Sequence, residues 1–129
     1  MPAPASYDYA YIRVVPRVER EEFLNAGIIL FARTARFLDA RLCFDEQRFS
    51  FLFPIVDVKE IRRHLDLFPV VARGGANAGP IGKLDMAERF HWLVSPRSSV
   101  VQVSQVHCGV SDDPAAALDH LVKALRGEG

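Results

Sequence analysis

The sequence predicts one α+β domain, in which a mainly antiparallel sheet of about four strands is covered by helices. Strand-like segments come first along the chain, helical segments follow, and one strand and one helix close it. No repeat or linker interrupts the 129 residues, a length that suits a single domain. We therefore expect one domain over residues 1–129, with flexible ends at 1–6 and 126–129.

The predicted strands lie mostly in the first half of the chain. Residues 7–15 alternate between a tyrosine face and an apolar face, as a half-buried strand does, and Pro16 is expected to end this strand. A single helical turn is expected within 19–25. The segments 28–33 and 37–44 are strand-like and separated by a short turn, which predicts a β-hairpin.

Two helices are predicted to begin at aspartates, whose carboxylates can accept hydrogen bonds from the N–H groups of a first helical turn. Asp45 precedes a short helix that Pro54 should end. Asp57 and Glu60 have capping-box spacing at the start of a longer helix, and Pro69 should end that helix.

The second half continues with a loop, a helix, a strand and a last helix. Glycine and proline are dense in residues 73–83, which predicts the loop. A helical period returns over 84–94, and a fourth strand is predicted over 100–107. Asp113 followed by Pro114 marks the start of the last helix, because aspartate caps well and proline suits the first helical position.

Composition limits the classes of function. The 16 basic and 16 acidic residues cancel, so the chain lacks the net basic field that binds polyanions at large. The amino terminus has neither the basic nor the apolar region of a signal peptide, and no stretch has the length of a membrane span. Cys43 and Cys108 are expected to be reduced thiols. These features predict a cytoplasmic protein.

Motifs that would hold a metal or a cofactor do not match. Gly82 and Lys83 resemble the end of a phosphate-binding P-loop, but Asn77 stands where the first glycine belongs and Leu84 where a hydroxyl residue belongs. The four histidines and two cysteines lack zinc-binding spacing. We therefore expect no metal and no cofactor.

The segment 97–107 carries a dense group of polar side chains. These are Arg97, Ser98, Ser99, Gln102, Ser104 and His107. Arg97 and the two serines after it offer donors suited to a carboxylate or a phosphate, which predicts an anion site. The alternative is a structural ion pair between Arg97 and a glutamate of 20–22. Arg13 and Asn25 are further candidate ligand-binding residues.

His107 is the candidate general acid or base, because histidine titrates near neutral pH and this one closes a predicted strand. Glu21 is the candidate second proton-transfer group. Alternation along a regular strand places His107 on the face opposite to Gln102 and Ser104 unless a bulge intervenes, so a shared site remains open. The alternatives are a histidine that only pins the strand end and a glutamate on a solvated charged face.

The tyrosines at 7, 9 and 11 share one face of the first strand with Arg13. Exposed aromatic rings beside an arginine can stack the bases of single-stranded nucleic acid. Because no RNA-binding motif and no net basic field accompany them, we favour a tyrosine face that is covered by a helix or buried in a homodimer.

Three segments resemble a known family. They are YDYAYIRVVPRVEREEFLNAGIILF near the amino terminus, the RGG…GP loop, and ERFHWLVSPRSSVVQVSQVHCG. Together they resemble the bacterial family called domain of unknown function 3037. The resemblance implies a small cytoplasmic protein with no assigned activity and a kinase-like protein as a partner. It implies no catalytic residues.

Two functions are consistent with these residues. The first is a non-enzymatic binding or accessory module, in which Arg97 and its serines recognise an anionic ligand or the acidic segment of a partner. The alternative is a small phosphoester hydrolase, with His107 and Glu21 transferring protons and Arg97 stabilising negative charge. We favour the first, because the sequence contains no complete catalytic constellation.

Overall fold

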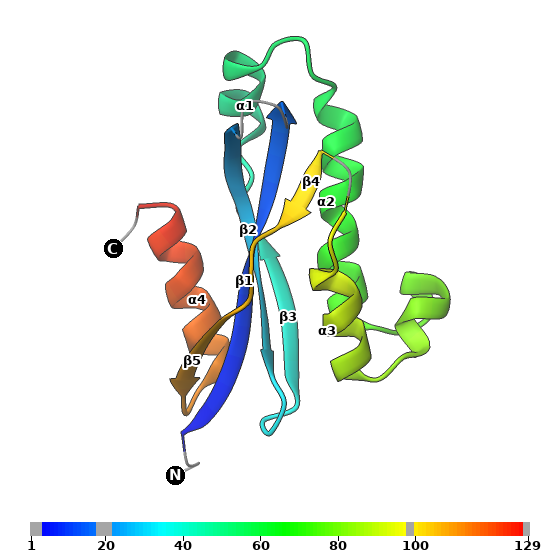
Figure 1. The fold of residues 1–129 in the computed structure, drawn as a ribbon, viewed down its shortest axis with the longest axis vertical. Helices are drawn as coiled ribbons and strands as arrows, with labels where there is room; N and C mark the ends of the chain where they lie inside the picture. The colour runs from blue at the N-terminus through cyan, green and yellow to red at the C-terminus, as the bar shows by residue number, and fades with distance from the viewer. Residues whose placement is uncertain (1–3, 18–21, 98–99, 128–129) are drawn as a thin grey trace.

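The computed structural model describes residues 4–17, 22–97 and 100–127, and it confirms an α+β fold with an antiparallel sheet of five strands (Figure 1). The elements in chain order are β1 (Ala5–Arg17), β2 (Glu22–Ala32), β3 (Phe37–Leu42), α1 (Glu46–Leu52), α2 (Val58–Arg73), the 3₁₀ segment η2 (Ala76–Lys83), α3 (Met86–Val94), β4 (Val101–Val103), β5 (His107–Ser111) and α4 (Pro114–Leu125).

The long strand β1 organises the sheet. On one side it pairs with β2, which pairs with β3 in the predicted hairpin. On the other side it pairs with β4 and with β5, which follow one another along the same edge (Figure 1). The segment 100–107, predicted as one strand, is therefore interrupted at 104–106, and that prediction is wrong.

Two predictions about the first strands are also wrong. β1 continues through Pro16, because the ladder with β2 is irregular at this point and tolerates a residue without an N–H group. Residues 22–25 belong to β2 rather than to a helical turn, since they pair antiparallel with β1. The remainder of that predicted turn, 19–21, lies outside the described residues.

Three helices begin where the sequence predicts, the helix predicted over 84–94 begins two residues later at Met86, and α2 ends later than predicted. The predicted aspartate caps are present at Asp45, Asp57 and Asp113. α2 runs through Pro69 to Arg73, so its predicted end is wrong. Val71 and Ala72, beyond the proline, are buried in the core. Their packing outweighs the helical hydrogen bond that proline cannot form.

The glycine-rich segment predicted as a loop is compact and mainly 3₁₀-helical. The Gly75 N–H group donates to the Gly82 carbonyl at 3.0 Å, which closes η2 on itself. Gly82 is needed there because a Cβ atom would overlap the Gly75 oxygen. The buried Arg89 side chain donates to the carbonyls of Leu84 and Ala72, at 2.6 and 3.4 Å, and ties this segment to α2.

The sheet separates two hydrophobic clusters. The larger one includes Ile12 of β1, Phe68 of α2 and Leu93 of α3. The smaller one joins Ile28 of β2 to Leu118 of α4, and the three tyrosines of β1 pack against it. Figure 1 shows α4 on the opposite side of the sheet from α2 and α3. α4 therefore covers part of the tyrosine face.

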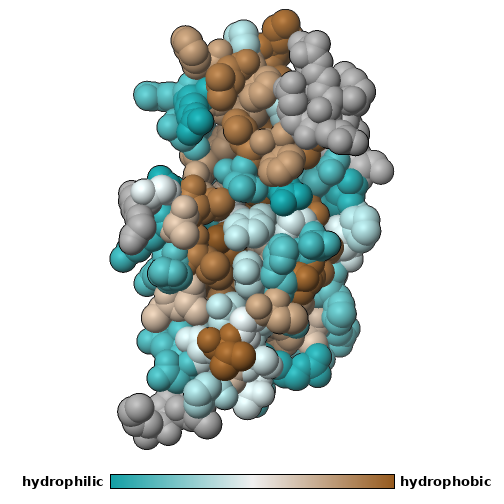
Figure 2. All heavy atoms as spheres, turned by 60° about the vertical axis from the view of Figure 1, so that its left-hand side comes forward, coloured by the Kyte–Doolittle hydropathy of each residue, from teal (hydrophilic) through white to brown (hydrophobic). Residues whose placement is uncertain are grey.

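Some large apolar side chains stay at the surface near α1. Phe51 is 86% exposed, Leu52 is 47% exposed, and Ile55 in the turn after the helix is 91% exposed. Figure 2 shows hydrophobic atoms at the surface of this end of the molecule. α1 buries only Phe49 among its seven residues, so its two other apolar residues, Phe51 and Leu52, stay at the surface beside four polar ones.

Candidate functional site

Arg97 caps the carboxyl end of α3. Its Nη1 atom donates to the carbonyls of Leu93 and Ser95 at 2.6 and 3.1 Å, and Nη2 donates to that of Trp92 at 3.2 Å. The guanidinium carbon also lies 5.0 Å from the ring centre of Phe68 and 5.1 Å from that of Trp92. Burial lowers the pKa of Arg97. These contacts give the side chain a structural role.

An anion-binding role for Arg97 therefore stays a prediction. The serines predicted to assist it, Ser98 and Ser99, lie outside the described residues, as does Glu21. The Arg97 side chain donates three hydrogen bonds to main-chain carbonyls at the end of α3. A ligand would therefore have to compete with these carbonyls or bind the N–H donors that remain.

Ser104 replaces a missing ladder partner where the edge strand breaks. Its Oγ accepts from the Tyr11 N–H group at 2.9 Å and donates to the Gln105 carbonyl at 2.9 Å. The Ser104 N–H group donates to the Tyr11 carbonyl, also at 2.9 Å. The hydroxyl satisfies backbone groups that the break between β4 and β5 would otherwise leave without partners. Ser104 is buried, and its hydrogen bonds give it a structural role.

His107 lies among the tyrosines. It pairs with Tyr9 across β1 and β5, with ring centres 5.3 Å apart, and its ring is 5.9 Å from that of Tyr11. Both tyrosines pack against the α4 cluster, whereas the Arg97 partner Phe68 belongs to the cluster on the other face. His107 and Arg97 therefore face opposite sides of the sheet and do not share a site.

Three predicted residues are brought together across the sheet. Arg13 of β1 pairs with Asn25 of β2 on one side and with Gln102 of β4 on the other. The guanidinium carbon of Arg13 lies 4.1 Å from the ring centre of Phe23. Its Nε atom is buried and has no hydrogen-bond partner within 4–17, 22–97 and 100–127. This row places a cation and two amides side by side.

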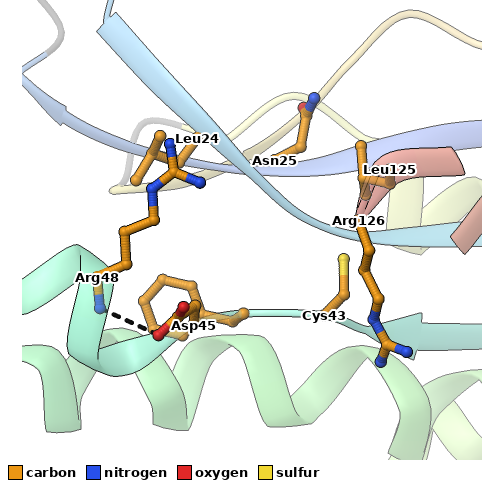
Figure 3. A pocket seen from close by; sticks show the side chains of 8 residues that line it. Leu24, Asn25, Cys43, Asp45, Arg48, Leu125 and Arg126 are labelled. Atoms are coloured by element: carbon orange, nitrogen blue, oxygen red, sulfur yellow. Dashed lines mark hydrogen bonds between the residues drawn. The ribbon is translucent and has the colours of Figure 1, made fainter. Parts of the chain in front are cut away.

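A pocket of about 220 Å³ opens next to Asn25. Figure 3 shows that β2, the segment after β3, α1 and the end of α4 supply its walls. Its lining residues are Leu24, Asn25, Cys43, Phe44, Asp45, Arg48, Leu125 and Arg126. One predicted ligand-binding residue, Asn25, thus belongs to a hollow whose other polar residues the sequence did not single out.

The charge of this pocket is positive. The Asp45 carboxylate is occupied by capping α1, where it accepts from the Arg48 N–H group at 3.0 Å. Across the residues that the structure describes, neither Arg48 nor Arg126 forms an ion pair. Nearby Arg62 differs, because its Nε atom lies 3.1 Å from a carboxylate oxygen of Asp66. Two unpaired guanidinium groups therefore flank one capping carboxylate.

Cys43 lies between the two arginines. Figure 3 shows Arg48 extending from α1 toward β2, whereas Arg126 extends from the end of α4 past Cys43 toward α2. Burial raises the pKa of the Cys43 thiol, and the positive charge of Arg126 opposes this to a smaller extent. At neutral pH Cys43 is therefore a protonated thiol rather than a nucleophilic thiolate.

The pocket continues into a more open hollow of about 400 Å³. The two hollows share Cys43, Phe44, Asp45 and Arg126, and the second one reaches Leu42 and Arg62. Together they form a groove along the end of β3. Its charge, its amide and its apolar walls suit recognition of an anionic group on a larger ligand.

Comparison with known proteins identifies the family. A family model described as Protein of unknown function (DUF3037) matches residues 9–125, most of the chain. The chain therefore belongs to this family, which confirms the resemblance seen in its sequence. No curated protein and no solved structure matches it. Among the helices of the described ranges, none has the length and apolar composition of a membrane span.

Proposed function

We propose that this protein is a non-enzymatic binding or accessory module of the bacterial cytoplasm that recognises an anionic group in the pocket between β2, α1 and α4. The observation that carries the proposal is the pair of arginines, Arg48 and Arg126, that flank the pocket without an ion-pair partner in the described ranges. Arginine binds carboxylates and phosphates through charge-assisted hydrogen bonds. Asn25 adds amide donors at the same rim.

Binding is favoured over hydrolysis by the separation of the candidate catalytic residues. A hydrolase needs an acid or base within hydrogen-bond reach of the group that carries the developing charge. His107 contacts tyrosines on one face of the sheet, and Arg97 contacts Phe68 on the other. Within the pocket that Arg48 and Arg126 flank, burial raises the pKa of Cys43 and keeps it a neutral thiol. The pocket therefore offers binding groups without a catalytic pair.

The same chemistry serves a small anion or a protein partner. A carboxylate of an acidic segment and a free carboxylate present the same acceptor to arginine. The kinase-like partner implied by the family resemblance is one candidate source of such a segment. Self-association as a homodimer is another, because each subunit carries acidic side chains.

A thermal-shift experiment tests the pocket. The wild type, Arg48→Glu, Arg126→Glu and the control Arg63→Glu, an exposed arginine of α2, are melted with and without inorganic phosphate and citrate. We expect the anions to raise the Tm of the wild type and the control but not of the two pocket variants, because a ligand that binds only the folded state raises its stability. Equal shifts in all four proteins, or no shift in any, would refute the anion pocket.

A further inference from the structure

Helix α1 carries both the pocket residue Arg48 and the exposed apolar side chains of Phe51 and Leu52. Phe51 and Leu52 follow Arg48 by three and four residues, a spacing that places side chains on the same face of a helix. Phe51 is 86% exposed, and Ile55, in the turn three residues after the end of the helix, is 91% exposed. A surface that combines large exposed apolar side chains with a polar rim is typical of an interaction site.

The arginines reach the pocket from different sides. Arg48 projects from α1 and Arg126 from the end of α4, with Cys43 between them (Figure 3). A single small anion held by one arginine leaves the other without a partner. A ligand with two spaced carboxylates satisfies both, and the groove beyond Cys43 gives an elongated ligand room to continue toward Arg62.

We infer that this α1 docking surface binds a protein segment that carries both carboxylates and large apolar side chains. The surface is defined by Asn25, Arg48, Phe51, Leu52, Ile55 and Arg126. The segment's carboxylates pair with the arginines, and its apolar side chains cover those of α1. Charge complementarity sets the sign of the segment, because the pocket side chains that form no ion pair with any described residue, Arg48 and Arg126, are cationic.

This inference rests on the proposed function, because both use the arginines of the pocket, but it requires more. An anion such as phosphate gains no binding energy from contact with the apolar side chains of Phe51 and Ile55. A protein segment can bury these side chains, and aromatic and large aliphatic side chains buried at the centre of an interface supply much of its binding energy. The apolar side chains therefore distinguish a docked segment from a small anion.

The test selects a ligand from a displayed library of random 16-residue peptides. The bait is the full chain, and binders to the double variant Arg48→Glu/Arg126→Glu are removed first. We expect the enriched peptides to interleave aspartate or glutamate with leucine, phenylalanine or tryptophan. The strongest peptide is then synthesised, and its Kd is measured by fluorescence anisotropy.

Matched variants separate the two kinds of contact. We expect Arg48→Glu, Arg126→Glu and the double variant Phe51→Ser/Ile55→Ser each to weaken peptide binding by about tenfold or more. The controls are Arg63→Glu and Leu67→Ser, which change a charge and a half-exposed apolar side chain on α2. We expect these controls to stay within about twofold of the wild type. Circular dichroism of each variant verifies folding.

The other outcomes overturn the inference in recognisable ways. If phosphate and citrate shift the wild type through Arg48 but no acidic peptide is enriched, or peptide binding ignores Phe51 and Ile55, the docked segment is refuted and the anion pocket stands. If neither anions nor peptides depend on the arginines, both proposals fail. If light scattering finds a dimer that Phe51→Ser/Ile55→Ser dissociates, the occupant is a second copy of this chain.

Discussion

The carboxyl end of α3 and the pocket beside α1 both present arginine side chains, and they use them differently. Arg97 directs its donors at three carbonyls of its own chain and lies against Phe68 and Trp92. Arg48 and Arg126 line a hollow and have no ion-pair partner among the described residues. An arginine that donates to carbonyls of its own chain stabilises the fold. One whose donors face a hollow is available to a ligand.

The two groups of arginines also differ in how much of their hydration they lose when the protein folds. Arg97 is partly desolvated, and the carbonyls at the end of α3 compensate its charge because a helix carboxyl end is electrically negative. Arg48 and Arg126 are exposed and keep their hydration until a ligand arrives. Removing Arg97 should therefore disturb the folded state, whereas removing the pocket arginines should disturb binding.

The largest expected effect is on stability, from Arg97→Ala. The substitution deletes three hydrogen bonds to carbonyls and the contacts with two aromatic rings, so we expect the free energy of unfolding to fall by about 2–3 kcal/mol. Urea unfolding followed by tryptophan fluorescence measures this change. If Arg97→Ala were as stable as the wild type and its Tm no longer rose with phosphate, Arg97 would be an anion-binding residue rather than a structural one.

Ser104→Ala should have the next largest effect. It leaves the half-buried Tyr11 N–H group without its acceptor, and an unsatisfied buried donor costs about 1–3 kcal/mol. Hydrogen exchange at the Tyr11 amide should accelerate together with this loss of stability. Unchanged exchange at Tyr11 would mean that water replaces the hydroxyl and that the break between β4 and β5 does not depend on Ser104.

The sequence predicts the parts of this molecule that local chemistry decides. The hairpin between β2 and β3 and the helix starts at Asp45, Asp57 and Asp113 depend on residues close together in the chain. The predicted ends of β1 at Pro16 and of α2 at Pro69 are wrong. An irregularity of the sheet accommodates Pro16, and tertiary packing of the residues after Pro69 maintains the helix. Long-range context, absent from local patterns, decided those two boundaries.

The candidate site was harder to predict for the same reason. Asn25, Arg48 and Arg126 come from three separate segments, and only the fold brings them to one hollow. We predicted a site at Arg97 and Ser104 because polar residues are dense in the segment 97–107. In the structure, both side chains form hydrogen bonds within the chain. Polar density in a sequence does not distinguish donors that the fold uses from donors that remain for a ligand.

The pocket arginines should contribute little to stability. We expect Arg48→Ala and Arg126→Ala each to change the free energy of unfolding by less than about 0.5 kcal/mol, because exposed side chains outside a network rarely contribute more. The same urea titration measures both. A loss comparable to that of Arg97→Ala would show that these arginines are structural too, and the contrast between the two regions would disappear.

The smallest expected effect is electrostatic and concerns Cys43. The charge of Arg126 lowers the thiol pKa against the stronger effect of burial, so Arg126→Ala should raise that pKa further. At pH 8 the thiolate fraction then falls, and alkylation of Cys43 in a Cys108→Ser background should slow by about two- to threefold. Maleimide labelling followed by mass spectrometry measures the rate, with Arg63→Ala as the matched control. Faster labelling would mean that Arg126 shields the thiol sterically more than it stabilises the thiolate. In that case its guanidinium lies across the pocket mouth, and a ligand must displace it before entering.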